Sequence, residues 1–240
     1  MNNDLLRVLE ETIYSINKPS HKNNKRSAKK VDNLHYAVQR HLSLKLEDSK
    51  YKIWTKTVDK KEYKVNGFFF KKNSDIVILN KEKDKVIATI EFKMPLSSVQ
   101  KNTINSITNM IGESTNIQLN GIKTFWIYCI REVTPVFNKN GVIQSFYKFD
   151  TSKYINLYEK KHNSGVALPY GLSLNIYKDN LELEKFREER DIGINLDRIH
   201  QEKSLFVEYV EDIKYNRNGL FINDYLNFID FIVEEVKRNE

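Results

Sequence analysis

Residues 74–95 read SDIVILNKEKDKVIATIEFKMP, and this stretch decides the fold that the sequence predicts. Two runs rich in β-branched residues, 76–79 and 86–90, flank a charged connection and predict two strands joined as a hairpin. Neither run alternates polar with apolar residues, which is typical of strands that are covered on both faces. We therefore expect the hairpin to lie in the interior of a sheet.

Three charged residues stand at the ends of these two strands. Asp75 precedes the first run, and Glu91 and Lys93 follow the second. Because strand side chains alternate between faces, Glu91 and Lys93 point to the same side. The simplest hairpin register puts Asp75 opposite Ile90, and a bulge of one residue would set it beside Glu91. Two carboxylates placed in this way form half of a site for Mg²⁺, which prefers oxygen ligands.

The order and spacing of these residues are similar to a known motif. Asp75, fifteen intervening residues and then Glu91-Phe92-Lys93 resemble the PD-(D/E)XK motif of nucleases. Ser74 stands where that family often has Pro. Within the superfamily the chain looks most like a type II restriction endonuclease, and the resemblance covers roughly the catalytic core.

This resemblance implies an activity and a role for each residue. The activity is Mg²⁺-dependent cleavage of double-stranded DNA at a specific sequence, with Mn²⁺ as a substitute metal. Asp75, Glu91 and the carbonyl of Phe92 would bind the metal, and Lys93 would orient or help to deprotonate the attacking water. Such an enzyme has one active site per chain and two DNA strands to cut, so we expect a homodimer.

Three alternatives stay open at this point. A repair or recombination nuclease with the same core would select branched or damaged DNA instead of a sequence. A non-catalytic DNA-binding module would bind duplex without metal-dependent cleavage. Structurally, Glu91 and Lys93 could be an ordinary cross-strand pair, with Asp75 a turn residue.

The flanking sequence predicts the rest of an αβββαβ core over residues 51–130. The elements expected are a helix at 28–46, strands at 51–58 and 63–70, the motif hairpin, a helix from Ser97 or Ser98 to about 118, and a strand at 123–130. A strand–helix–strand crossover predicts that this last strand pairs parallel to the Glu91 strand. Ile104, Ile107 and Ile111 should face the sheet from the second helix.

The predicted fold class is α/β, with a restriction-endonuclease-like core around a mixed sheet, N-terminal helices and a C-terminal helical extension. We expect one nuclease domain over residues 1–240, in which residues 131–240 serve DNA recognition or dimerisation. That part should contain a hairpin around Asn138–Gly141, a short helix from 152 to about 161, a strand at 172–177, and helices at 205–213 and 226–236. The apolar stripe of residues 226–236 is the preferred dimer interface.

The charge of the chain favours a polyanionic partner. The net charge is +7 and the isoelectric point is about 9.2, which point to nucleic acid before membrane. The candidate DNA contacts are Lys71, Lys72, Asn102, Asn105, Asn109, His162, Asn163 and Ser164. The basic segment 18–30 is either a flexible connector or a phosphate-contacting arm.

Other reactive residues are expected to be structural. Cys129 lies in an apolar run and predicts a core residue, with no disulfide possible within the chain. His35 and His41 fit packed or surface positions on a helix. The resemblance makes Glu10 or Glu11 a candidate extra metal ligand, with a solvated helix face as the alternative. No run is long enough to cross a membrane, so we expect a cytoplasmic protein.

Overall fold

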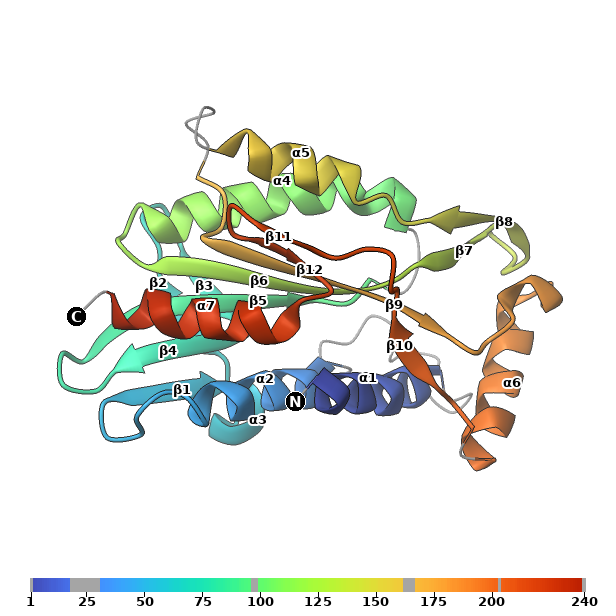
Figure 1. Cartoon of the computed structure of the whole chain (residues 1–240), viewed down its shortest axis with the longest axis horizontal. Helices are drawn as coiled ribbons and strands as arrows, with labels where there is room; N and C mark the ends of the chain where they lie inside the picture. The colour runs from blue at the N-terminus through green and yellow to red at the C-terminus, as the bar shows by residue number, and fades with distance from the viewer. Residues whose placement is uncertain (1, 18–30, 96–98, 162–166, 203, 239–240) are drawn as a thin grey trace.

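The computed structural model describes residues 2–17, 31–95, 99–161, 167–202 and 204–238 (Figure 1). These residues form an α/β fold around a mixed sheet, in which the strand order is β1-β4-β5-β6-β9-β12-β11 and β10 pairs with β9. The strands of this sheet are β1 (Tyr51–Thr55), β4 (Ile76–Asn80), β5 (Lys85–Lys93), β6 (Lys123–Arg131), β9 (Gly171–Asp179), β10 (Val207–Tyr209), β11 (Tyr215–Arg217) and β12 (Leu220–Ile222).

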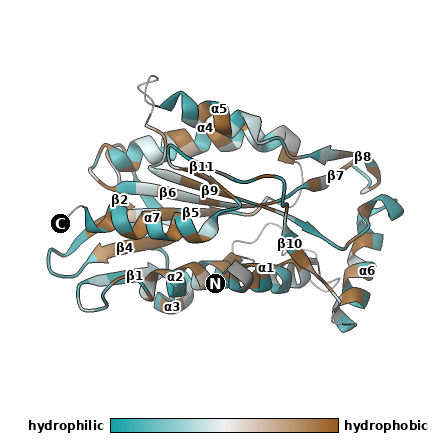
Figure 2. Ribbon diagram, in the orientation of Figure 1, coloured by the Kyte–Doolittle hydropathy of each residue, from teal (hydrophilic) through white to brown (hydrophobic). Residues whose placement is uncertain are grey.

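Helices cover both faces of the sheet. One face packs against α1 (Asn2–Asn17), α2 (Asp32–Ser43), α6 (Glu189–Gln201) and α7 (Tyr225–Lys237), and the other against α4 (Val99–Gln118) and α5 (Ser152–Glu159). The short helix α3 (Lys56–Asp59) follows β1. Figure 2 shows hydrophobic residues along the central strands, while the helices carry both colours. Each helix therefore buries one face and leaves the other to solvent.

The motif hairpin has the bulge that the sequence allows. Leu79 pairs with Val86 but Ile78 pairs with Ala88, so Ile87 is the extra residue in β5. Beyond the bulge Ile76 faces Ile90, and the next step outward brings Asp75 opposite Glu91. The predicted interior position is confirmed, because β4 lies between β1 and β5, and β5 between β4 and β6.

A crossover through α4 connects β5 to β6. The two strands pair parallel, with Glu91 beside Trp126, as the strand–helix–strand pattern predicts. The chain thus contains, in this order, helix α2, strands β1, β4 and β5, helix α4 and strand β6. Strands β2 (Tyr63–Asn66) and β3 (Lys71–Ser74) are inserted between β1 and β4 and pair only with each other.

Two of the predicted strands are shorter than expected. The run at 51–58 stops at Thr55, where α3 begins, and the run at 63–70 stops at Asn66. Gly67 starts a turn, and the three phenylalanines that follow it are exposed. Aromatic residues read as strand formers by composition, but the turn at Gly67 ends the strand before them.

The face that helix α4 turns to the sheet agrees only in part with the predicted one, because Ile107 packs against the core and Ile104 does not. Ile104 is exposed, and Thr103, Met110 and Ile117 are buried instead. Burial of Thr103 is possible because its hydroxyl donates to the carbonyl of Val99 at 2.7 Å, within the helix. The isoleucine spacing was therefore only a partial guide to the buried face.

The C-terminal part is partly different from the prediction. Residues 205–213 form no helix, because Val207–Tyr209 pair with β9 as strand β10, and the helix α6 just before them was missed. The hairpin of β7 (Val133–Phe137) and β8 (Ile143–Lys148) is confirmed, with Gly141 at a positive φ of 80°. Helix α7 is also confirmed.

The apolar stripe of α7 is not free to form a dimer interface. Phe228, Ile229, Ile232 and Val236 are all buried in the core of their own chain. That prediction is wrong because the stripe has the sheet to cover. No helix in the described ranges is long and apolar enough to span a membrane.

Candidate functional site

The ends of β4 and β5 bring two carboxylates together. Asp75 lies opposite Glu91, and its Oδ2 accepts a hydrogen bond from the backbone N–H of Phe92 at 2.9 Å. Glu91 is buried and points to the face of the sheet that α4 covers, beside Trp126. Lys93 lies two residues further along the same face, is exposed, and holds its ammonium 5.5 Å from the centre of the Trp126 ring. The structure thus places all three charged motif residues at one strand end.

A second lysine occupies the space beside Glu91. Lys72 Nζ lies 2.6 Å from Glu91 Oε2 and 3.3 Å from Glu113 Oε2, so it bridges a strand and a helix. Its side chain is largely buried. Lys72 was predicted to contact DNA; instead it points inward and pairs with the candidate metal ligand. Lys72 lies on the same face of β3 as the buried Ser74, and this burial could not be read from the sequence.

Burial dominates the electrostatics of this pair. Burial raises the pKa of Glu91 to about 7; Lys72 opposes this rise, and the nearby Asp75 adds to it. Burial alone would lower the pKa of Lys72, but Glu91 and Glu113 raise it above its usual value. The Lys72 ammonium at 2.6 Å limits this rise in pKa, yet Glu91 accepts a proton far more readily than an exposed glutamate does and is only partly ionised at neutral pH.

The site has a free oxygen where a cation could bind. Glu91 Oε1 is buried and has no hydrogen-bond partner among the described residues, while Oε2 is held by Lys72. The N–H and C=O of one strand residue point to the same edge, so the carbonyl of Phe92 shares the edge that faces Asp75. Two carboxylates, a carbonyl and water are the oxygen ligands that Mg²⁺ takes. The chemistry of these donors suits the predicted metal, which Asp75, Glu91 and the carbonyl of Phe92 would hold.

Asp75, Glu91 and the carbonyl of Phe92 would have to bind the metal without help from Glu10 or Glu11. Within the described residues no group of three or more His, Cys, Asp or Glu side chains is placed to hold an ion. Glu10 accepts a hydrogen bond from the backbone N–H of Val207 at 3.0 Å, and Glu11 pairs with Arg7 on the same helix. Glu10 therefore helps to pack α1 against β10. Glu11 lies on the solvated face of α1, which was the alternative to a role as metal ligand.

The two predicted structural histidines are both buried on α2. The ring of His35 meets that of Phe92 edge-on with centroids 5.4 Å apart, and burial lowers its pKa despite the nearby Asp75. His41 bonds the hydroxyl of Tyr225 at 2.8 Å and Asp4 at 3.1 Å, and burial, helped by Arg40, lowers its pKa to about 4. Both are neutral packing residues near pH 7.

Other predicted positions divide between exposed and undescribed ones. Asn102, Asn105 and Asn109 are exposed on α4, at the spacing of one helix face, and Lys71 is exposed on β3. His162, Asn163, Ser164 and the basic segment 18–30 lie outside the described residues. Cys129 is buried, which raises the pKa of its thiol, and its prediction as a core residue is confirmed.

Two residues of α4 were missed as parts of this region. Glu113 contacts Lys72, and Asn116 is buried and binds the turn before β3 through its side chain. Neither residue belongs to the isoleucine spacing that predicted the buried face of the helix. Their partners lie about 40 residues earlier in the chain, so no local pattern on the helix could reveal them.

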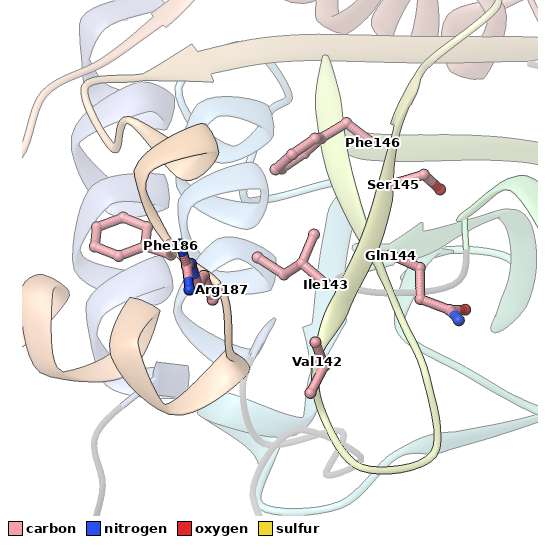
Figure 3. A pocket seen from close by; sticks show the side chains of 7 residues that line it. All are labelled: Val142, Ile143, Gln144, Ser145, Phe146, Phe186 and Arg187. Carbon is pink, nitrogen blue, oxygen red and sulfur yellow. The ribbon is translucent and has the colours of Figure 1, made fainter.

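A shallow pocket of about 350 Å³ lies elsewhere, between β8 and residues 186–187 (Figure 3). Ile143 and Phe146 project to one side of the strand, and Gln144 and Ser145 to the other. The Ile143 N–H donates to the carbonyl of Arg187 at 2.8 Å, so a β-like backbone hydrogen bond joins the two segments that line the pocket. Neither Asp75 nor Glu91 lines it.

Comparisons with known proteins add no relative to this picture. No family model, curated protein or solved structure matches the chain. The functional argument therefore depends on the arrangement at the ends of β4 and β5: two opposed carboxylates, a buried oxygen without a partner, and an exposed lysine on the same face.

Proposed function

We propose that this protein is a Mg²⁺-dependent endodeoxyribonuclease with a PD-(D/E)XK active site, and that it acts as a type II restriction endonuclease. The observation that carries this proposal is the bulged register of β4 and β5, which sets Asp75 opposite Glu91 with Lys93 on the same face. The succession of α2, β1, β4, β5, α4 and β6 supports it, because the resemblance implies an αβββαβ core.

Each residue has a defined part in phosphodiester hydrolysis. Asp75, Glu91 and the carbonyl of Phe92 would hold Mg²⁺, which supplies positive charge and lowers the pKa of a bound water. The N–H of Phe92 fixes the orientation of Asp75. Lys93 is exposed and cationic, so it can orient the attacking water and neutralise charge that develops on the phosphate.

Lys72 acts as a positioning residue. By binding Oε2 of Glu91 it favours the ionised form of a buried carboxylate and leaves Oε1 for another ligand. Glu113 in turn helps to hold Lys72 from α4. This arrangement preorganises the acidic side of the site before any ligand arrives.

The test is cleavage of an unmethylated phage genome by the purified protein with Mg²⁺, followed by sequencing of the fragment ends. Wild type should give discrete fragments with one shared end sequence, and Lys93→Ala should give none. Lys85→Ala is the matched control, because Lys85 is an exposed lysine at the other end of the same strand. It should cut like wild type.

Each other outcome selects a different function. Cleavage of branched DNA alone would favour a repair or recombination nuclease. Binding of duplex without any cleavage would leave a DNA-binding module. Wild-type cutting rates in Lys93→Ala would refute the proposed active site itself.

The proposal extends to a homodimer on DNA. One chain contributes one Asp75–Glu91–Lys93 site, and two antiparallel strands need two such sites related by a two-fold axis. The interface must lie outside the buried stripe of α7. Light scattering with and without cognate duplex should report a dimer on DNA; a persistent monomer that accumulates nicked plasmid before linear product would contradict it.

A further inference from the structure

Three consecutive phenylalanines form an exposed turn between β2 and β3. Phe68, Phe69 and Phe70, here called the Phe turn, are 61%, 68% and 56% exposed. Single exposed apolar residues are common on proteins, but a contiguous apolar patch marks a surface for a partner. The Phe68 and Phe69 rings meet edge-on, with centroids 5.0 Å apart. The turn therefore presents a compact aromatic tip to the solvent.

The buried Asn116 holds the Phe turn in one conformation. Its backbone carbonyl accepts from the N–H of Phe68 at 2.7 Å, and its Oδ1 accepts from Phe69 and Phe70 at 2.9 and 3.2 Å. Its Nδ2 donates to the carbonyl of Phe70 at 3.0 Å. A turn fixed in this way loses little conformational entropy when it binds a partner.

Gly67 is required for this contact. A Cβ at this position would lie 2.1 Å from Nδ2 of Asn116, which is closer than any side chain can approach. The chain thus devotes a glycine and a buried asparagine to holding aromatic rings in the solvent.

The surroundings of the Phe turn are basic. Lys64 and Lys71 are exposed on the two strands that carry it. Phe70 stands two residues before Lys72, about 7 Å along the strand, and the side chain of Lys72 reaches Glu91 of the candidate active site. A polyanion that reached Asp75 and Glu91 would pass beside these aromatic rings.

We propose that the Phe turn inserts against the bases of duplex DNA and partly unstacks them next to the bond that is cut. This inference rests on the proposed nuclease function for the choice of partner. Phenylalanine is one of the side chains that proteins wedge between base steps, and stacking on bases tolerates any sequence. The exposed lysines would meet the phosphates on either side of the rings. Phe69, the most exposed of the three, forms the tip.

The experiment measures binding and base stacking without cleavage. Short duplexes carry a fluorescent adenine analogue whose emission rises when it leaves the stack, and Ca²⁺ replaces Mg²⁺ to suppress turnover at low salt. Wild type should raise the emission. Phe69→Ala should lose that rise and bind at least about tenfold more weakly, since stacking on one base is worth roughly that factor.

Matched variants separate the wedge from general effects. Phe206→Ala removes a phenylalanine that is 53% exposed on another part of the surface and should behave like wild type. Phe69→Tyr keeps the ring and should keep the signal. Gly67→Ala should lose the signal with all three rings intact, because the added methyl collides with Asn116. Thermal unfolding of each variant confirms that the fold is kept.

The outcomes distinguish this proposal from the nuclease proposal. Unchanged affinity and emission in Phe69→Ala would overturn the wedge, whether or not the protein cleaves DNA. A Phe69-dependent signal in a wild type that never cleaves would keep the wedge and reject the nuclease. Loss of self-association in Phe69→Ala with unchanged DNA binding would show a contact between copies of the chain and refute the wedge. Failure of wild type to bind any duplex would reject both.

Discussion

Two buried Lys–Glu pairs in this molecule differ in how completely their atoms are satisfied. Lys123, at the start of β6, bonds both the side chain and the carbonyl of Glu235 on α7 at 2.8 Å, and Glu235 Oε1 pairs with Arg238. Lys72 bonds Glu91 at a similar distance of 2.6 Å, yet Oε1 of Glu91 has no partner in the described part of the chain. The first pair closes on itself, and the second leaves an acceptor for something else.

This contrast separates a buried ion pair whose polar atoms are all bonded from one that leaves a carboxylate oxygen open to a ligand. A buried ion pair repays its desolvation only if its remaining polar atoms are hydrogen-bonded. Glu235 meets that condition, and its pair ties the C-terminal helix to the sheet. Glu91 does not meet it, and Asp75 lies opposite as an additional negative charge. An incompletely satisfied carboxylate pair at strand ends is the arrangement expected of a cation site.

The largest expected effect is on cleavage. Glu91→Gln should reduce the rate of DNA cleavage by at least about a hundredfold, because it removes a charge that acts on the reacting phosphate through the metal. Glu235→Gln should leave the rate within about twofold of wild type, because the pair with Lys123 lies outside the site. Initial rates on supercoiled plasmid measure both. Equal losses in the two variants would erase the distinction between the pairs.

Stability should change in the opposite order. Glu235→Gln should lower the free energy of unfolding by about 3 kcal/mol, since it leaves the buried ammonium of Lys123 without its carboxylate. Glu91→Gln should change it by less than about 1 kcal/mol, because Lys72 keeps Glu113 as a partner and a buried charge without full solvation is removed. Urea unfolding, followed by far-UV circular dichroism, gives both values. A larger loss in Glu91→Gln would make that pair the structural one.

Metal binding offers a readout that needs no substrate. At a free Mg²⁺ concentration tenfold above its dissociation constant, wild type should gain about 1.4 kcal/mol of stability over its value in EDTA. Asp75→Asn and Glu91→Gln should lose this gain, and Glu235→Gln should keep it. Thermal unfolding over a Mg²⁺ titration measures the gain. A gain that survives in Asp75→Asn would place the ion elsewhere.

The smallest expected effect is a pH dependence in EDTA. The folded pKa of Glu91 is raised from 4.5 to about 7, so between these values the native state binds more protons than the unfolded state. The stability that Glu91 contributes is fully present below pH 4.5 and is lost as pH rises through about 7. The slope has an upper limit of about 1.4 kcal/mol per pH unit, and the coupling to Lys72 reduces it.

The measurement is the difference in unfolding free energy between wild type and Glu91→Gln over that range. Wild type should lose stability relative to Glu91→Gln as the pH is raised. Glu235→Gln serves as the control, and it should follow wild type in this range. A difference that stays constant with pH would show that Glu91 is as easy to ionise as an exposed glutamate.

Patterns of a few neighbouring residues in the sequence correctly predicted the central strands and the way they connect. The β-branched runs identified β4 and β5. Strand alternation alone predicts that the side chains of Glu91 and Lys93 share one face of β5. The parallel pairing of β5 with β6 follows from the strand–helix–strand connection through α4. The resemblance to a nuclease motif added the roles of these residues, which stay a proposal.

The remainder depended on contacts between distant residues. Lys72 could be recognised as the partner of Glu91 only once β3 folds back over β5, and Asn116 only once α4 docks beside the Phe turn. The spacing of isoleucines assigned Ile104 to the core, but Ile104 is exposed and its neighbour Thr103 is buried. Thr103 can be buried because its hydroxyl is hydrogen-bonded within its own helix. Residues 205–213 have helical spacing, but pairing of Val207–Tyr209 with β9 overrode it.

The bulge at Ile87 also has a meaning for how such a site can arise or disappear. Strand side chains follow a two-residue phase, and one extra residue shifts that phase for everything that comes after it. If Ile87 were paired in a regular ladder instead, Asp75 would face Ile90 and lose Glu91 as its neighbour, with every charged residue of the motif still in the sequence. The number of residues between Asp75 and Glu91 and the bulge therefore compensate for each other, and a chain without Ile87 would keep the two carboxylates opposed with no bulge. A search for functional relatives of this chain should accordingly let the spacing between Asp and Glu vary by one and ask whether a bulge compensates.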